Sequence, residues 1–243
     1  MSSKPTWVFV VGPYRTASTT QYEIVRDILE ATKSGKGVGY YDQRGWKVRN
    51  FDDAEHGKMI VCKAFVFLPY SSPQVNIFFE QGRLRAAATI RDPRDIATSM
   101  KIRSERLGND DWSFETTVVE YFPKWLAQFE TWVEKLGPDD IIVSKYEEFT
   151  TDLLTEVHRL SEFLGVDLSD DQAKNIAVRY DKEAMMIRKK KAHKKGEKED
   201  EWLPSIPSIV TGVSGKYKEH LTLKELNLVE ETNADFMRRW GYA

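Results

Sequence analysis

The residues best suited to chemistry lie near the N-terminus, in the segment GPYRTASTT at 12–20. This segment follows an apolar run at 7–12 and precedes a stretch with helical periodicity. Small and hydroxyl-bearing residues in such a turn leave the backbone N–H groups at the start of the helix pointing at one spot, where the helix dipole adds positive potential. Arg15 adds a full positive charge there. The segment therefore predicts a site for a phosphate or sulfate group.

The same segment differs from the triphosphate-binding loop GxxxxGK[ST] at the positions that reach the phosphates. Gly12 and Thr19 match the first and last residues of that pattern, whereas Ala17 and Ser18 replace its second glycine and its lysine. A small-molecule kinase that uses ATP and Mg²⁺ is therefore only an alternative. A plain strand–turn–helix connection with a capping Ser or Thr is another.

A second segment with chemical potential is RDPRDIATS at 91–99, which starts where another apolar run ends. If Arg91 and Ser99 meet at one phosphate, they supply a charge-assisted hydrogen bond and a hydroxyl donor. A structural interpretation is also open, because Asp92 can cap the following helix and Pro93 suits its first turn. The two interpretations are compatible.

The elements that must position these residues alternate along the chain. Short apolar runs typical of buried parallel strands lie at 7–12, 58–68, 84–91 and 140–145. We expect helices at 21–32, 92–108, 113–136, 150–165, 169–181 and 222–240. Pro123 should kink or split the long third helix, and 34–57 should form a loop or weak strands. This alternation predicts a three-layer α/β/α fold around a mostly parallel sheet, in which ligands bind where strands end and helices begin.

The composition limits which partners the chain is expected to bind and which cellular compartment it suits. The chain has 243 residues, which fits one domain over 1–243 with a charge-dense segment at about 182–201. Its 36 Lys and Arg against 38 Asp and Glu give a net charge of −2, which favours neither nucleic acid nor an anionic membrane. Cys62 is the single cysteine and the 4 histidines form no zinc pattern, so we expect no disulfide and no metal site. The apolar run at 7–11 is too short for a membrane span or a signal peptide, which favours a cytoplasmic protein.

Four segments together resemble the motifs of sulfotransferases that use 3′-phosphoadenosine 5′-phosphosulfate (PAPS). Residues 15–19, RTAST, resemble the family's [K/R]-[S/T]-G-[S/T]-T loop, and residues 91–99 resemble its R-x-P-x-D-x-x-x-S motif. KYEEF at 145–149 resembles its YEDL segment, and GVSGKYKEHLT at 212–222 resembles its late GxxGxWxxxLT loop. The pieces occur in the family's order, so the resemblance extends over almost the whole chain.

The resemblance implies a P-loop-like sulfotransferase architecture, with PAPS as donor and 3′-phosphoadenosine 5′-phosphate (PAP) as product. It assigns the nucleotide to Arg15, Thr16, Ala17, Ser18, Thr19, Thr20, Arg91, Ser99, Tyr146, Thr211 and Gly212. Arg15 stands at the family's catalytic lysine and would act as a charge clamp, because a guanidinium keeps its proton. Lys63 matches a strand-end lysine that the cytosolic branch places near the sulfuryl group. A lysine that merely extends from its strand, and a core tyrosine, are the alternatives for Lys63 and Tyr146.

One departure from the family concerns the base that takes the proton of the acceptor. Phe65 stands where the cytosolic branch has a histidine. The heparan-type branch uses a Glu from the equivalent stretch. Here the candidates lie just before the second strand: His56 and Glu55 first, with Asp52 and Asp53 beside them. An amine acceptor would need less help from a base.

Two further departures concern the nucleotide. Val210 and Thr211 replace the Arg and Lys that usually precede the first glycine of the late loop, so another cation must assist the 3′-phosphate. Thr20 replaces a tryptophan that stacks on adenine in the cytosolic branch, so stacking must come from elsewhere, with Tyr146 and Tyr180 as candidates.

We therefore expect a PAPS-dependent sulfotransferase that acts on a hydroxyl or amine of a small-molecule or sugar acceptor. A PAP-binding or PAPS-binding protein without catalysis is the alternative, since the family histidine is missing. The acceptor pocket should come from 34–57, 66–80 and 182–210, whose residues do not name the acceptor. Within the last segment, RKKKAHKK at 188–195 either covers the nucleotide, attracts an anionic acceptor or is solvated surface. The oligomeric state is left open.

Overall fold

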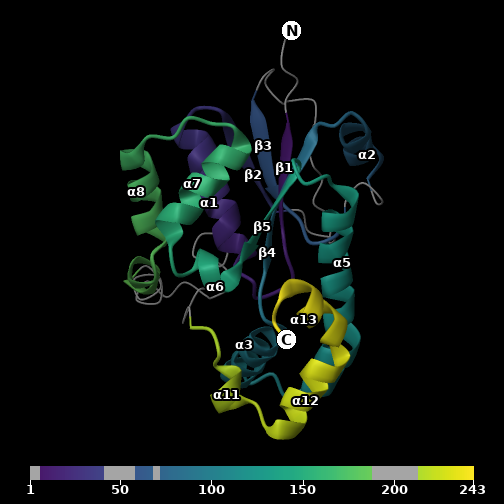
Figure 1. Cartoon of the computed structure of the whole chain (residues 1–243). Coiled ribbons are helices and arrows are strands. Elements are labelled where there is room, and N and C mark those ends of the chain that lie inside the picture. Colours follow the sequence, from purple (N-terminus) through teal and green to yellow (C-terminus); the bar gives the residue numbers. More distant parts are fainter. Residues whose placement is uncertain (1–5, 41–57, 68–71, 188–212) are drawn as a thin grey trace.

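The computed structural model describes residues 6–40, 58–67, 72–187 and 213–243. At its centre is a five-stranded sheet with the strand order β2-β3-β1-β4-β5, in which every neighbouring pair is parallel (Figure 1). The strands are β1 (Trp7–Val11), β2 (Gly35–Tyr40), β3 (Met59–Lys63), β4 (Leu84–Ile90) and β5 (Ile141–Lys145). All carboxyl ends of the strands therefore lie at one edge of the sheet.

Helices cover both faces of the sheet, because the buried side chains of each strand alternate between two cores. Val8 and Val10 of β1 belong to one core, and Trp7, Phe9 and Val11 belong to the other. The first core is covered by α1 (Ser18–Ala31), α7 (Leu153–Leu164) and α8 (Asp170–Tyr180). The second is covered by α2 (Pro73–Glu80) and α5 (Phe122–Lys135) (Figure 1). The expected three-layer α/β/α fold is confirmed.

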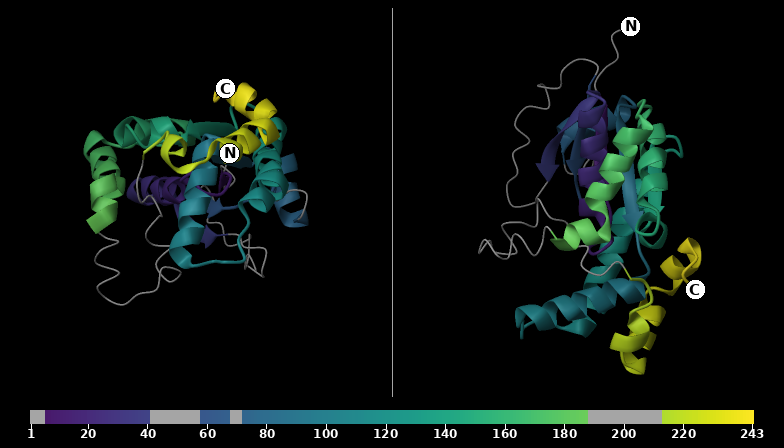
Figure 2. Two further views of the ribbon diagram at one scale, coloured as in Figure 1. Left: turned by 90° about the horizontal axis from the view of Figure 1, so that it is seen from below. Right: turned by 90° about the vertical axis from the view of Figure 1, so that its left-hand side faces the viewer.

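A third group of helices lies beyond the carboxyl edge of the sheet, as Figure 2 shows. It comprises α3 (Pro93–Leu107), α11 (Tyr217–His220) and α12 (Leu223–Thr232). A small core that includes Ile96, Val118 and Val229 joins α3 and α12 to the start of α5. The last helix, α13 (Ala234–Trp240), packs against α5 through Phe236 and belongs to the second core. Lys101 of α3 also donates to Glu225 of α12 at 2.8 Å. The C-terminal part of the chain is thus attached to the helix that follows β4.

Several boundaries differ from expectation. The second apolar run forms a strand only to Lys63, and residues 35–40, expected as loop or weak strand, form the edge strand β2. The stretch at 113–136 is split into α4 (Phe114–Thr116), a π-helical turn η3 (Thr117–Tyr121) and α5, and Pro123 lies in the first turn of α5. The last predicted helix, 222–240, is interrupted at Asn233, which separates α12 from α13. Across the described residues, none of the helices has the length and apolar character needed to cross a bilayer.

Candidate functional site

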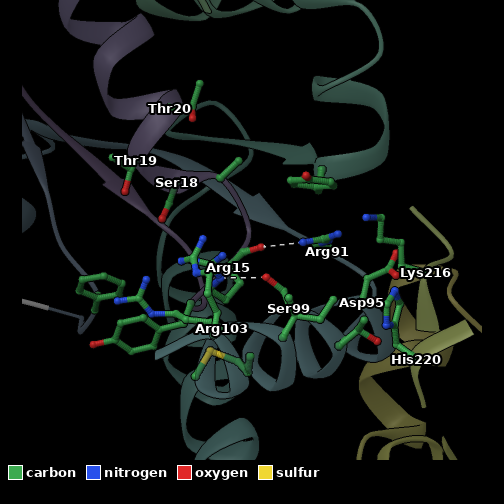
Figure 3. Close-up of a pocket in the computed structure, with 18 of the residues that line it drawn as sticks. Arg15, Ser18, Thr19, Thr20, Arg91, Asp95, Ser99, Arg103, Lys216 and His220 are labelled. Atoms are coloured by element: carbon green, nitrogen blue, oxygen red, sulfur yellow. Dashed lines mark hydrogen bonds between the residues drawn. The ribbon is translucent and has the colours of Figure 1, made fainter. Parts of the chain in front are cut away.

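The predicted site residues come from the ends of four adjacent strands. Arg15 follows β1, Lys63 is the last residue of β3, Arg91 directly follows β4, and Tyr146 directly follows β5. All four line one cavity of about 650 Å³ (Figure 3). β1 is the central strand, and the chain continues to β2 and β3 on one side of it and to β4 and β5 on the other. Such a reversal of strand order opens a crevice at the carboxyl edge, where open α/β sheets bind their ligands.

The first loop is held in place by a close approach to β4. A Cβ atom at Gly12 would lie 2.5 Å from Thr89 Oγ1 and 2.7 Å from the Thr89 carbonyl oxygen, so only glycine fits. Thr16 is fully buried, donates its hydroxyl proton to the Pro13 carbonyl at 2.8 Å and lies 2.8 Å from the Thr89 hydroxyl. Thr16 therefore fixes the loop against β4, while its neighbours in the loop line the cavity.

The loop presents the start of α1 to the cavity. Ala17, the residue before α1, has a left-handed conformation with φ 67°, and its side chain offers no cap to the helix. Ser18, Thr19 and Thr20 line the cavity. The hydroxyl of Thr20 is buried, and within the described part of the chain it has no hydrogen-bond partner. These features suit an anionic ligand at the helix N-terminus.

Two arginines from different strand ends meet in the middle of the site. Arg15 Nε donates to Ser99 Oγ at 2.9 Å, and Arg91 Nη1 donates to the Arg15 carbonyl oxygen at 3.3 Å (Figure 3). The guanidinium of Arg91 stacks on the ring of Tyr146, with its central carbon 3.9 Å from the ring centroid. Arg91 Nε is buried, and no described residue accepts a hydrogen bond from it. The two arginines thus form a cationic pair in which Arg91 Nε can still donate to a ligand.

Lys63 lines the cavity in an unusual setting for an ammonium group. It is 5% exposed, donates to Thr19 Oγ1 at 2.6 Å, and lies 4.9 Å from the ring centroid of Phe65 and 5.3 Å from that of Tyr40. Burial lowers the pKa of Lys63 to about 7, although the Glu23 carboxylate acts in the opposite direction. Near neutral pH, Lys63 can therefore gain or lose its proton when a charged ligand binds.

The lining is strongly cationic. Among the residues that the structure describes, it contains one carboxylate, Asp95, and six Lys and Arg side chains, namely Arg15, Lys63, Arg91, Arg103, Arg106 and Lys216. Burial, followed by the nearby charges of Arg103, Arg91 and Arg106, lowers the pKa of Arg15 to about 10. Arg15 keeps its charge at pH 7, and the crowding of like charges favours any anion that enters.

The late loop reaches the site through Asp95. The backbone N–H of Gly215 donates to Asp95 Oδ2 at 2.8 Å, which fixes the loop against α3. Lys216 and His220 then line the cavity beside Asp95 and Arg91 (Figure 3). The late loop therefore contributes Lys216 and His220 to the cavity, whereas the two residues that the sequence singled out there, Thr211 and Gly212, lie outside the described residues.

Further lining residues were missed because they belong to no motif. Tyr14 stacks on Phe65, with ring centroids 4.6 Å apart, and contacts Trp125 at 4.7 Å. Arg103 and Arg106 follow Ser99 on α3. The four-residue spacing of Asp95, Ser99 and Arg103 is a signal that places them on one face of that helix.

Not every predicted site residue lies in the cavity. Tyr180 is wrong as a stacking residue for the nucleotide, because it is buried between α8 and α1 and its hydroxyl donates to Asp27 at 2.9 Å. Four predicted residues lie outside the described residues: Glu55, His56, Thr211 and Gly212. The same holds for Asp52, Asp53 and the basic run at 188–195.

Solved structures with the same fold are sulfotransferases and a related enzyme. A mouse sulfotransferase, SULT7A1 complexed with PAP, superposes with a TM-score of 0.66 at 18% identity and covers 96% of this chain and 85% of its own. Retinol dehydratase in complex with androsterone and PAP superposes with a TM-score of 0.63 at 16% identity. The match covers 98% of this chain and 82% of the retinol dehydratase chain.

Relatives among curated protein sequences are also sulfotransferases. Sulfotransferase 2A6 of Rattus norvegicus is 22% identical over 152 residues, which is 56% of this chain and 50% of the relative. Sulfotransferase 2A2 of Mus musculus is 22% identical over 157 residues, 60% and 54% respectively. The chain thus spans about half the length of the curated relatives it matches. The sequence model of one protein family, the sulfotransferase domain, matches residues 67–241, which is well over half of the chain. The chain therefore belongs to the sulfotransferase domain family.

Proposed function

We propose that this protein transfers a sulfuryl group from PAPS to a hydroxyl or amine of a small-molecule or sugar acceptor. The observation that carries the proposal is the convergence of Arg15, Arg91 and Ser99 on the start of α1, in one cationic cavity at the carboxyl edge of a parallel sheet. PAP is present in the mouse sulfotransferase and retinol dehydratase structures with this fold.

The residues of the cavity fit such a nucleotide. PAPS carries a 3′-phosphate and a 5′-phosphosulfate, and the cavity offers charged donors for each. Two buried polar atoms that no described residue satisfies, Arg91 Nε and Thr20 Oγ1, belong to side chains that line it. A buried donor without a partner costs about 1–3 kcal/mol, which a ligand oxygen would recover. The volume is also in the usual range for a bound small molecule.

When bound, PAPS supplies the sulfuryl group: its S–O bond to the phosphate breaks, a new bond from sulfur to the acceptor forms, and the acceptor loses a proton. The transition state of such a transfer is loose, by analogy with phosphoryl transfer, so the protein acts by positioning and charge. Arg15 would stabilise the charge that develops between the sulfuryl oxygens and the leaving phosphate. Ser99 holds the Arg15 guanidinium in place through its hydroxyl. Lys63, protonated in the complex, would place a second positive charge beside Thr19.

Different parts of the site would hold the two anionic ends of the nucleotide. We assign the 5′-phosphosulfate to the first loop and the 3′-phosphate to Arg91 and Ser99. Val210 and Thr211 occupy the positions where the family's late loop usually has Arg and Lys, so these positions carry no positive charge. We therefore assign the cation that replaces them to Lys216, which lies beside Arg91 (Figure 3). Tyr146 would position Arg91 through the stacking contact.

The acceptor proton needs a base, and the site residues that we propose for it are His56 and Glu55, in the segment that leads into β3. Phe65, at the family's histidine position, packs against Tyr14 and Lys63 and cannot take a proton. A protein that binds PAP without catalysis is the alternative that this substitution favours. Turnover with an acceptor panel, after PAP binding is established, separates the two.

The experiment that tests the proposal is a thermal-shift titration with PAP, with 5′-AMP and ATP–Mg²⁺ as comparisons. At about 100 times its Kd a ligand adds roughly 2.7 kcal/mol of stability. For a chain of this size that raises Tm by about 5–10 °C. We expect this shift with PAP and a smaller one with 5′-AMP. A shift with ATP–Mg²⁺ alone would overturn the proposal in favour of a kinase.

A further inference from the structure

A carboxylate lies in the otherwise cationic lining of the cavity. Among the described residues that line it, Asp95 is the only Asp or Glu. Asp95 belongs to the first turn of α3 and is 1% exposed, so protein surrounds it on nearly every side. Like charges placed next to each other weaken binding. A carboxylate beside a site for phosphate therefore opposes the ligand unless it contacts a hydrogen-bond donor.

The two oxygens of Asp95 differ in their contacts. Oδ2 accepts a hydrogen bond from the backbone N–H of Gly215 at 2.8 Å and so fixes the late loop. Oδ1 is buried, and no described residue donates a hydrogen bond to it. A buried charged oxygen without a donor is costly, so Oδ1 should meet a donor when the cavity is filled. The neutral oxygen of an asparagine would suffice to hold the loop, and the second charged oxygen therefore points to the ligand.

Asp95 lies among the residues that we assign to the 3′-phosphate. Ser99 follows it by four residues on α3, which places the two on one face of the helix. Lys216 directly follows Gly215, the residue that donates to Asp95. Figure 3 shows Arg91, Asp95 and Lys216 at the same side of the cavity. Asp95 Oδ1 would therefore lie near the 3′-phosphate, although charge repulsion prevents a direct contact with the phosphate oxygens.

The nucleotide has few groups that could donate to this oxygen. When its phosphates are ionised, PAP donates only through the adenine amino group and the ribose 2′-hydroxyl. The 2′-carbon is bonded to the 3′-carbon that carries the phosphate, whereas the amino group lies at the far end of the base. With the 3′-phosphate at Arg91 and Lys216, the 2′-hydroxyl is thus the donor closest to Asp95. A carboxylate at the carboxyl edge of a parallel sheet binds a ribose hydroxyl in the same way in dinucleotide-binding folds.

We propose that Asp95 Oδ1 accepts a hydrogen bond from the ribose 2′-hydroxyl of the bound nucleotide, and that Asp95 thereby selects ribonucleotides over 2′-deoxyribonucleotides. This proposal rests on the proposed function, because it takes the 3′-phosphate to lie at Arg91, Ser99 and Lys216. A charged acceptor suits the role, since its hydrogen bonds are stronger than those of a neutral oxygen. One side chain would then fix the late loop through Oδ2 and orient the ribose through Oδ1.

The test compares three nucleotides by calorimetry. They are PAP, 2′-deoxyadenosine 3′,5′-bisphosphate, and the analogue with fluorine in place of the 2′-hydroxyl. The deoxy compound leaves the position empty, whereas the fluoro compound fills it with an electronegative atom that has no proton to donate. Both remove a hydrogen bond to a charged acceptor, so we expect each to bind at least about tenfold more weakly than PAP.

A variant of the same shape assigns the preference to Asp95. In Asp95→Asn the amide oxygen can still accept from the Gly215 N–H, and an NH₂ group then replaces Oδ1. PAP and the deoxy compound should bind this variant within about threefold of each other. If Asp95 served the loop alone, both ligands would lose affinity equally and their ratio would stay unchanged.

The control is Asp92→Asn, a second buried carboxylate at the start of the same helix. Asp92 accepts a hydrogen bond from the Arg94 N–H at 2.9 Å as the helix cap, and asparagine caps helices equally well. The preference for PAP over the deoxy compound should be the same in this variant as in the wild-type protein. If Asp95→Asn does not fold, Asp95→Ala replaces it and should also abolish the preference.

The outcomes separate this inference from the proposed function. Absence of PAP binding by the wild-type protein would reject the proposed function. If PAP binds, equal affinity for PAP and the deoxy compound would overturn the contact with the 2′-hydroxyl. A fluoro compound that binds as tightly as PAP would overturn the donation of a proton to Asp95. A preference for PAP that survives in Asp95→Asn would overturn the assignment to Asp95.

Discussion

The cavity has two regions that are built in different ways. The strand-edge region consists of Arg15, Lys63, Arg91 and Tyr146. Lys63, Arg91 and Tyr146 lie at or directly after the ends of β3, β4 and β5, and Arg15 lies in the loop between β1 and α1. The α3 region, made of Arg103 and Arg106, lies on the last turns of a helix beyond the sheet. Lys63, Arg91 and Tyr146 are each at most 6% exposed, whereas Arg106 is exposed.

This difference separates a rigid site from an adjustable one. A side chain at the end of a buried strand is fixed by the sheet register, so changing it disturbs the core as well as the ligand. A side chain on the outer turns of a helix can change with little cost to folding. The strand-edge region therefore suits the part of a reaction that stays constant, whereas substitutions in the α3 region should alter the cavity lining with little disturbance of the core.

The largest effect should come from Arg15, at the centre of the strand-edge region. Removing one preorganised donor to developing charge typically costs about 10²–10³ in rate, so Arg15→Ala should reduce kcat by that factor. PAP affinity should fall by far less, because the first loop and Arg91 remain. Steady-state kinetics and calorimetry measure the two quantities. Unchanged turnover, with Lys218→Ala as the control, would remove Arg15 from the mechanism.

Arg91 should have the next largest effect, and it divides the strand-edge region. Truncating one member of a buried charged contact costs about 2–5 kcal/mol, so Arg91→Ala should weaken PAP by at least about thirtyfold and 5′-AMP by much less. Lys216→Ala should reduce the preference for PAP by a smaller factor, about fivefold, because its side chain is less buried. Equal losses for PAP and 5′-AMP would contradict the assignment of the 3′-phosphate.

Lys63 should make nucleotide binding in the strand-edge region depend on pH. Its pKa is about 7 because it is buried, and a bound anion would raise that value. PAP binding above pH 7 should therefore take up a proton, and PAP affinity should fall by up to about tenfold per pH unit between pH 7.5 and 9. The phosphates of PAP, with second pKa values near 6, are already ionised in this window.

The control for this prediction is Lys63→Met, which removes the ammonium group and keeps an unbranched side chain. Calorimetry in buffers with different ionisation enthalpies counts the protons directly. The wild-type protein should take up close to one proton and the variant none. A wild-type affinity that is flat from pH 7.5 to 9 would show that Lys63 does not sense the nucleotide.

The sequence predicted the strand-edge region far better than the α3 region, for a physical reason. Motifs such as RTAST and RDPRDIATS record backbone shape as well as chemistry, so Arg15, Arg91 and Ser99 were found together with the elements that hold them. Arg103 sits in an ordinary amphipathic helix, where a charged residue is usually solvated surface. Its place in the cavity lining depends on how α3 is positioned at the edge of the sheet, which no local pattern encodes.

The prediction of strands and helices also failed where the local sequence carries little signal. The internal strands β1, β3 and β4 were predicted because their composition reflects burial on both faces, and β5, at the other edge of the sheet, was predicted from its apolar run. The edge strand β2, GKGVGY, has three glycines and no fully buried position, so its composition resembled that of a loop. The break at Asn233 between α12 and α13 was also missed, since it depends on where α13 packs against α5.

The smallest predicted effect concerns the shape of the first loop. Ala17 has φ 67°, a conformation that costs an L-residue about 1–2 kcal/mol, and the family's motif has glycine there. Ala17→Gly relieves that strain but adds about 0.5–1 kcal/mol of chain entropy to lose on folding. The net change should be a gain of about 0.5–1 kcal/mol, which raises Tm by about 1–4 °C in thermal denaturation. Ala31→Gly, at the right-handed C-terminal end of the same helix, should lower Tm instead. If both substitutions lower Tm, the loop does not store strain at Ala17, and its left-handed turn is stabilised by the surrounding contacts alone.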